Sequence, residues 1–168
     1  EPQSGREIVN WVNGLKDNVR QSVSGFDLTF SPAKSVSVVW ALSDEETARR
    51  IEALHHQAVK EAMAWAEDNV FFTRSGKQGC EQVKTKGFVA SEFKHYDTRA
   101  GDPDLHSHVL VSNKVQTEDG RWLSIDGYTL MKYHQSISHR YDSILNTLLS
   151  NQMGYTFTAR DHGANKEP

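Results

Sequence analysis

The chain has few of the residues that hold small extracellular folds together. Its 168 residues include one cysteine, so no disulfide can form within the chain, and only four prolines. A lone cysteine fits a reducing compartment, and we expect a cytoplasmic protein. No apolar run approaches the length of a transmembrane helix, and the first residues show no signal-peptide pattern. We expect no membrane partner.

The chain also lacks an excess of positive charge. It has 19 Lys and Arg against 22 Asp and Glu, a formal net charge of −3. That balance excludes bulk attraction of nucleic acid, so a polyanion would need a local basic patch or the charge of a bound metal. The chain is 37% hydrophobic and 24% charged, as in globular domains that bury a sizeable core. Because it begins at Glu1 rather than Met, we expect a piece of a longer protein.

The hydrophobic pattern of the first half predicts one strand and two helices. Residues 25–30 alternate apolar and polar side chains, as in a half-buried strand. Ser31 and Pro32 resemble a helix start, and we favour a short buried helix to residue 42, although its valines also suit a strand. Ser43, or alternatively Asp44, is expected to cap a second helix that runs to about Asp68.

The second half predicts a run of strands and then a long helix. Strands are expected over 70–74, 80–84, 87–95, 105–115 and 122–125. An apolar helical stripe follows Asp126 and should end at Gly154. We expect an α+β fold, an antiparallel sheet with helices packed on one face. As domains, we expect an N-terminal segment, 1–24, partly helical over 7–19, and a core, 25–168, truncated at both ends.

Three histidines close together form the most informative motif. His106 and His108 alternate on a predicted strand, so their side chains emerge on one face about 7 Å apart. The turn residues between His95 and His106 would place His95 beside this pair on a neighbouring strand. Three imidazoles on one face are typical ligands of a divalent cation. We predict a metal site on the sheet face opposite the helices.

The other histidines are expected to be structural or to lie on the surface. His55 and His56 are adjacent on a predicted helix, where neighbouring side chains point in different directions. Asp27 is the only acid of its strand and faces away from the apolar side chains. If this strand lies beside the histidine strands, Asp27 can orient a ligand imidazole or accept a proton. The alternative is an edge-strand aspartate facing water.

The motifs resemble those of a known family. The sequence Gly25-Phe-Asp-Leu-Thr-Phe-Ser-Pro-Ala-Lys-Ser-Val-Ser, followed by His95, Arg99 and Asp102-Pro-Asp-Leu-His-Ser-His, resembles the relaxase domain of conjugative relaxase-helicases. This is the MobF family, of TraI/TrwC type, among the histidine-hydrophobe-histidine endonucleases. The resemblance implies a palm-like relaxase fold. It also implies site-specific nicking of one strand of plasmid DNA at the transfer origin, by a tyrosine that stays joined to the 5′ end.

The resemblance also implies roles for individual residues. His95, His106 and His108 match the three metal ligands, for an ion such as Mg, Mn, Zn or Ni. Asp27 matches the acid that supports a ligand histidine and serves as general base. The implied partner is single-stranded or hairpin DNA at a transfer origin, and a C-terminal helicase and the conjugation machinery are further possible partners.

Four basic residues are candidates for DNA contacts. Lys34 and Arg99 fall within the motifs that match the family. Arg74 and Lys77 lie by a predicted hairpin turn, where they would supply phosphate contacts or simply form a solvated surface.

The chain departs from the family pattern at two points. Ser107, between the two ligand histidines, is a small hydroxyl residue rather than a hydrophobe. The family's catalytic tyrosines precede Gly25, but residues 1–24 contain no tyrosine, and we expect that segment to be missing. Tyr141 is expected in the core, and as a helix tyrosine it is the weaker alternative nucleophile. Two other functions stay open: a DNA-binding module without chemistry, and a three-histidine hydrolase that uses metal-bound hydroxide.

Overall fold

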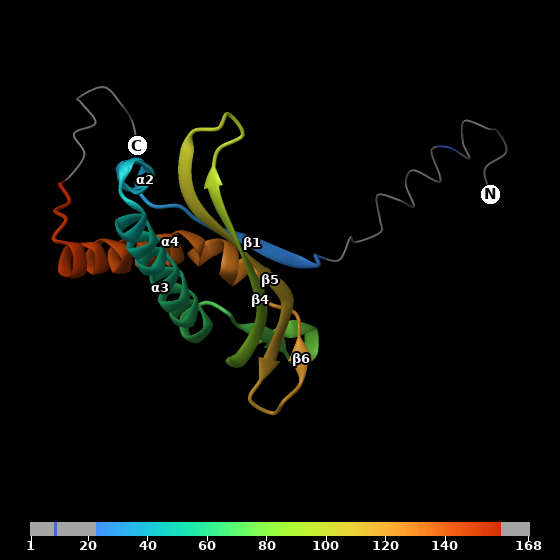
Figure 1. Ribbon diagram of the computed structural model, residues 1–168. Coiled ribbons are helices and arrows are strands. Elements are labelled where there is room, and N and C mark those ends of the chain that lie inside the picture. Colours follow the sequence, from blue (N-terminus) through green and yellow to red (C-terminus); the bar gives the residue numbers. More distant parts are fainter. Residues whose placement is uncertain (1–8, 10–22, 159–168) are drawn as a thin grey trace, which may run out of the picture.

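A twisted antiparallel sheet and three helices make up the protein in the computed structural model, which describes residue 9 and residues 23–158 (Figure 1). The strand order of the main sheet is β1-β5-β4, and β6 pairs with the end of β5. A separate ribbon joins β2 to β3. The strands are β1 (Gly25–Phe30), β2 (Thr73–Ser75), β3 (Glu81–Val83), β4 (Thr85–Asp97), β5 (Pro103–Thr117) and β6 (Trp122–Leu123).

The helices are α2 (Lys34–Leu42), α3 (Glu45–Asn69) and α4 (Gly127–Met153). Helix α3 begins where the Asp44 carboxylate accepts the Thr47 amide at 3.0 Å, which selects Asp44 over Ser43 as the cap. Helix α4 ends at Gly154, whose φ of 72° is easy only for glycine. Helices α3 and α4 pack against each other on one side of the sheet (Figure 1). The predicted α+β architecture is confirmed.

Strand alternation separates the sheet into a core face and an open face. Val109 and Val111 of β5 are buried, as are Ile51 and Ala58 of α3 and Leu145 of α4. Strands β1 and β5 pair with Leu28 opposite Val109, and β4 and β5 pair with His95 opposite His106. Paired residues point to the same face. Between Ala90 and His95 of β4, and along the parts of β1 and β5 beside them, the register therefore places every second residue on the open face; the pairing of β4 shifts before Ala90 and after His95.

Three local predictions were wrong in detail. Helix α2 begins after Ala33, with no side-chain cap, rather than at Ser31 and Pro32. Only Val36 and Ser37 of this helix are buried, because a single stripe faces β5. Residues 70–72 do not form a strand, since Val70 is the C-cap of α3, and the strand begins at Thr73.

Two further predictions concern an N-terminal helix and the absence of a membrane-spanning helix. The helix predicted over residues 7–19 lies outside the described residues, apart from Val9. Among the described residues, no helix combines the length and the apolar character needed to span a bilayer.

Candidate metal centre on the open face of the sheet

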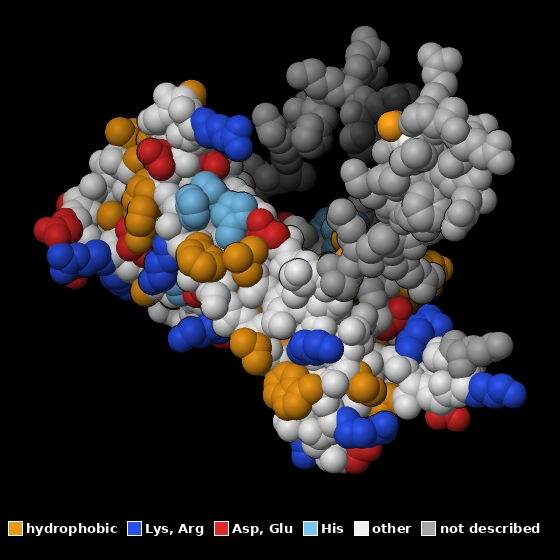
Figure 2. Space-filling view, turned by 90° about the vertical axis from the view of Figure 1, so that its right-hand side faces the viewer, with side chains coloured by type: hydrophobic (Ala, Val, Ile, Leu, Met, Phe, Trp, Pro, Cys, Tyr) orange, Lys and Arg blue, Asp and Glu red, His pale blue; other side chains and the backbone are white. Residues whose placement is uncertain are grey.

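The fold brings the three predicted ligand histidines together. The ring centroids of His95 and His106 lie 5.0 Å apart, those of His95 and His108 5.1 Å, and those of His106 and His108 5.3 Å. His95 comes from β4, and the other two residues come from β5. Figure 2 shows histidine side chains gathered at the surface beside acidic and apolar side chains. Three imidazoles thus form a nearly equilateral cluster at the surface of the sheet.

The spacing of the rings fits a single ion. In zinc sites the metal–nitrogen distance is about 2.1 Å and the nitrogen lies about 1.1 Å from the ring centre, so each centroid sits about 3.2 Å from the ion. Three such rings at tetrahedral angles have centroids about 5.2 Å apart. The observed separations of 5.0, 5.1 and 5.3 Å match that value. The donor set suits a divalent cation that accepts imidazole nitrogen.

Hydrogen bonds hold two of the three rings by the same nitrogen. His108 Nδ1 donates to the Asp27 carboxylate at 2.9 and 3.0 Å and lies 3.2 Å from Thr29 Oγ1. His106 Nδ1 donates to the backbone carbonyl of Asp104 at 2.8 Å. A proton on Nδ1 leaves the lone pair on Nε2, which is the nitrogen available to a metal. Both rings are set in one tautomer before any ion binds.

The position of Asp27 follows from the pairing of β1 with β5. Thr29 pairs with His108 and Asp27 with Leu110, so both β1 side chains share the open face with the histidines. The condition that we set for Asp27, that its strand lies beside the histidine strands, is fulfilled, and Asp27 lies next to His108. Its side chain is 47% exposed, so a carboxylate oxygen can also reach a reactant.

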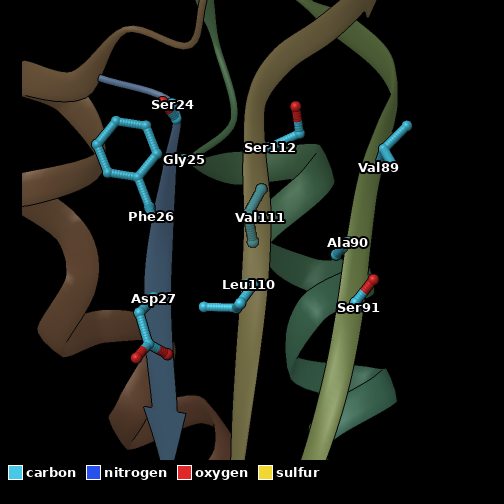
Figure 3. Close-up of a pocket in the computed structure, with 10 residues that line it drawn as sticks. All are labelled: Ser24, Gly25, Phe26, Asp27, Val89, Ala90, Ser91, Leu110, Val111 and Ser112. Atoms are coloured by element: carbon cyan, nitrogen blue, oxygen red, sulfur yellow. The ribbon is translucent and has the colours of Figure 1, made fainter. Parts of the chain in front are cut away.

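A shallow groove of about 460 Å³ continues from Asp27 along the open face. Figure 3 shows Asp27, Leu110 and Ser91 side by side on the three strands that form its floor. Two large apolar side chains of this face are about half exposed, Phe93 at 49% and Leu110 at 46%. Phe93 pairs with His108. Polar and apolar groups suited to a phosphate and to a base lie next to each other here.

The four predicted DNA-contacting residues have different surroundings. Lys34 donates to the Pro103 carbonyl at 2.5 Å and lies 3.6 Å from Asp104, so it helps to hold the start of β5 near the histidines. Arg99 is exposed on the turn between β4 and β5. Arg74 donates to the buried Asp126 carboxylate at 2.8 Å, a contact that joins β2 to the start of α4. Lys77 is exposed on the β2–β3 connection.

Among the described residues, no tyrosine ring is an aromatic neighbour of His95, His106 or His108, the three predicted ligands. Tyr141 is buried in the core at 1% exposure, on the helix side of the sheet, as predicted. Burial also raises the pKa of its hydroxyl above the usual range, which disfavours a nucleophilic phenolate. Tyr96 follows His95 on β4 but stacks on Trp40 at 5.6 Å. Tyr128 and Tyr133 are exposed on α4.

Sequence reasoning missed a second polar cluster, on the opposite face of the sheet. His55, His56 and Glu92 each offer a ligand atom within 4.8 Å of the others. His55 has the structural role that we expected, with both ring nitrogens hydrogen-bonded in the core. The ring centroids of the adjacent His55 and His56 lie 5.2 Å apart, so both imidazoles can approach Glu92. Only the tertiary packing of α3 on β4 and β5 brings these groups together.

Comparisons with known proteins agree with this geometry. The family model "TrwC relaxase" matches residues 2–167. The multifunctional conjugation protein TraI of Escherichia coli is 38% identical over 115 residues, which cover 68% of this chain and 6% of TraI. TraI of strain K12 is 36% identical over the same length. This chain spans only a small part of those relatives.

Solved structures give the same result. A copper-bound structure of the conjugative relaxase TrwC with oriT DNA superimposes with a TM-score of 0.70 at 30% identity, over 82% of this chain and 47% of that one. The structure of TrwC with a 27-mer DNA that comprises the recognition hairpin and the cleavage site superimposes with a TM-score of 0.71 at 28% identity. The match covers 82% of this chain and 48% of that one. This chain spans about half of those structures. With a family model that covers nearly its whole length, the chain belongs to the TrwC relaxase family.

Proposed function

We propose that this chain is the metal-bearing part of a conjugative relaxase, which nicks one strand of plasmid transfer-origin DNA by tyrosine transesterification. The observation that carries the proposal is the cluster of His95, His106 and His108 on an open sheet face, with Asp27 bonded to His108. Membership of the TrwC relaxase family and the DNA-bound structures of TrwC support it.

In this proposal the three histidines hold a divalent ion against the scissile phosphate. Neutral imidazoles leave the charge of the ion uncancelled, so that it stabilises the negative charge that builds up on the phosphate oxygens. Asp27 keeps His108 in the tautomer that offers Nε2. The same half-exposed carboxylate is our candidate to accept the proton of the attacking phenol, whose ordinary pKa near 10 requires a base at neutral pH.

The donor set narrows the choice of metal without fixing it. Imidazole nitrogen suits Zn, Ni, Mn or Cu better than Mg, which prefers oxygen ligands. The near-tetrahedral spacing of the rings favours Zn among our predicted ions.

The proposed DNA partner is single-stranded and is held by local contacts. The chain carries a net charge of −3, so phosphates would be bound near the metal and by the exposed Arg99, while Phe93 offers a ring for base stacking. Lys34 and Arg74 already hold protein groups, and Lys77 lies on the separate β2–β3 ribbon. We rank Arg99 first among the four. We also place the protein in the cytoplasm, with a helicase as a possible neighbouring domain.

Metal binding is the first test. Calorimetry with Zn²⁺, Ni²⁺ and Mn²⁺ should show one site in the chain and a loss of affinity in His106→Ala of about 100-fold or more, above the roughly 10–100-fold that is typical when only a group supporting a ligand is lost. His134→Ala is the matched control, because His134 is exposed on α4 and bonds only the Met131 carbonyl among the described residues. Unchanged affinity in His106→Ala would refute the proposed centre.

The chemistry requires a second test. The chain, and a version extended upstream, are incubated with labelled single-stranded transfer-origin DNA and the preferred metal, and protein–DNA adducts are separated on a denaturing gel. We expect a metal-dependent adduct with the extended version, because the tyrosines of the described chain lie away from the histidines. An adduct of the given chain that Tyr141→Phe abolishes would instead identify the helix tyrosine as nucleophile.

The placement of the tyrosines also supports a second candidate, a module that binds metal and single-stranded DNA without cutting it. If neither version forms an adduct while both bind the DNA in a metal-dependent way, this candidate replaces the relaxase. Turnover of small phosphate esters without an adduct would point to a hydrolase.

A further inference from the structure

A chain of polar side chains lies directly behind the two ligand histidines of β5. Tyr141 Oη of α4 is 2.8 Å from His55 Nδ1 of α3, and His55 Nε2 is 2.9 Å from Ser107 Oγ. The Ser107 hydroxyl donates to Glu92 Oε1 of β4 at 2.8 Å. His55 and Ser107 have no exposed surface, and Tyr141 is 1% exposed. Four elements are thus connected through the one residue between His106 and His108.

The hydrogen bonds of this chain run in a single direction. Because the Ser107 proton goes to Glu92, the Ser107 oxygen must accept from His55 Nε2–H. His55 Nδ1 then accepts from the Tyr141 hydroxyl. His56 Nδ1 donates to the same Glu92 oxygen at 2.7 Å. Only this arrangement gives every donor and acceptor of Tyr141, His55 and Ser107 used here a hydrogen-bond partner. A buried network in which all polar groups are hydrogen-bonded holds its side chains in fixed positions.

The protonation states agree with this direction. Burial lowers the pKa of His55 to about 4, so its ring carries one proton at neutral pH. Burial raises the pKa of Tyr141, which therefore remains a donor. Burial also acts to raise the pKa of Glu92, but hydrogen bonds from Ser107 and His56 more than offset it, and the carboxylate accepts both.

We propose that the Tyr141–His55–Ser107–Glu92 chain is a positioning network that fixes the backbone of Ser107 and so aligns His106 and His108 for the metal. This inference rests on the proposed metal centre. In a strand, the side chain of Ser107 points to the core while its two neighbours point to the open face, so one backbone segment carries both groups. Metal sites need their ligands held within about 0.5 Å, and supporting hydrogen bonds commonly provide this precision.

The network also gives a physical reason for a hydroxyl at position 107. A hydrophobic side chain there would leave His55 Nε2–H without its acceptor in the core and would deprive Glu92 of a donor. Threonine or serine satisfies both groups. The departure from a histidine-hydrophobe-histidine motif is therefore coupled to the imidazole behind it.

The same cluster could be considered as a second set of metal ligands, with His55, His56 and Glu92 within reach of one another. Both nitrogens of His55 already have hydrogen-bond partners, and His56 Nδ1 is bonded to Glu92. Only His56 Nε2 is buried without a partner in the described part of the chain. An ion that used His55 as a ligand would have to break one of the two hydrogen bonds that satisfy this buried imidazole, so the arrangement favours a network over a ligand set.

The test compares two variants with a matched control, using Co²⁺ as the probe. Ser107→Ala removes the central hydroxyl, and Tyr141→Phe removes one oxygen at the far end of the network. Thr117→Val removes a buried hydroxyl of the same strand, whose partners, the Asp119 carboxylate and the Arg121 carbonyl, belong to the turn after β5 and not to the histidine cluster. We expect Ser107→Ala to weaken Co²⁺ binding about tenfold and to shift the visible absorption bands of the bound ion. Tyr141→Phe should weaken Co²⁺ binding and shift the absorption bands to a smaller extent. Thr117→Val should change the free energy of unfolding but neither the Co²⁺ affinity nor the spectrum.

Wild-type affinity and spectrum in both Ser107→Ala and Tyr141→Phe would overturn the proposal. So would undiminished Co²⁺ binding in the triple variant His95→Ala, His106→Ala, His108→Ala, which would assign the ion to the His55 cluster. If the wild-type chain bound no Co²⁺, the metal centre itself would fail. The positioning role would then be decided by NMR of the metal-free chain, where Ser107→Ala, but not Thr117→Val, should move the ring signals of His106 and His108; unmoved signals would overturn it.

Discussion

The buried imidazole of His55 predicts a marked loss of stability in mild acid. Its side chain has no exposed surface, and both ring nitrogens are occupied by Tyr141 and Ser107. Burial lowers the pKa of this imidazole from 6.5 to about 4. Protonating the folded ring would place a charge in the core and put a proton on Nδ1, where the Tyr141 hydroxyl now donates.

The magnitude follows from proton linkage. Between pH 6.5 and 4 the unfolded chain binds a proton at His55 and the folded chain does not, so the free energy of unfolding falls as the pH falls. For these two pKa values the loss between pH 7 and pH 5 is about 2 kcal/mol, rising to about 3 kcal/mol below pH 4. This is a large share of the 5–15 kcal/mol that is typical of a domain, roughly a fifth of it.

Urea unfolding at pH 7 and pH 5, in the presence of a chelator, measures this effect. The comparison is with His55→Gln, which removes the buried imidazole and leaves the other seven histidines of the chain in place. We expect His55→Gln to be less stable at pH 7 but to lose about 2 kcal/mol less than the wild type between the two pH values. His134→Gln, an exposed site, should behave like the wild type. Equal pH dependence in wild type and His55→Gln would refute the argument.

Three further predictions concern other parts of the fold. Asp27→Asn keeps the shape of the carboxylate but removes its charge from His108, and calorimetry should show a metal affinity roughly 10–100-fold weaker. Gly25→Ala places a Cβ only 2.6 Å from the Val111 carbonyl oxygen, so the chain must shift between β1 and β5; urea unfolding should show a loss of about 1–3 kcal/mol. Leu145→Ala empties a site of 1% exposure between α4 and the core and should cost about 2–5 kcal/mol by the same measurement, without changing metal affinity once the variant is folded.

The site was largely predictable where its geometry is local. The period of a β-strand alone places His106 and His108 on one face, and turn residues alone return the chain so that His95 can pair with His106. Neither the strand period nor the turn depends on the rest of the fold. The position of Asp27 could be predicted only on the assumption that β1 lies beside the histidine strands. That assumption concerns the pairing of β1 with β5, about 80 residues away in the chain. No local pattern specifies which strands become neighbours.

The errors also have a common physical cause, which is competition between local signals and tertiary contacts. Ser31 and Pro32 are good helix-start residues, yet the helix begins after Ala33 without a side-chain cap. Val70 and Phe71 look like strand residues by composition, but they end α3 and fill the core. Arg74 was a candidate phosphate contact on charge alone, and the structure pairs it with the buried Asp126. Each outcome depends on partners that are distant in sequence.

The cluster behind Ser107 shows how far such distant partners shape a short motif. Alternation along β5 exposes His106 and His108 to the open face and buries Ser107 at 0% exposure. What fills position 107 is then decided by the residue that faces it from α3. An imidazole at position 55 needs an acceptor for its Nε2 proton, and an unpaired buried donor costs about 1–3 kcal/mol. A serine meets that need and passes its own proton to Glu92. The identity of the middle residue is thus a property of the helix–sheet interface, while the two histidines on either side belong to the chemistry of the open face.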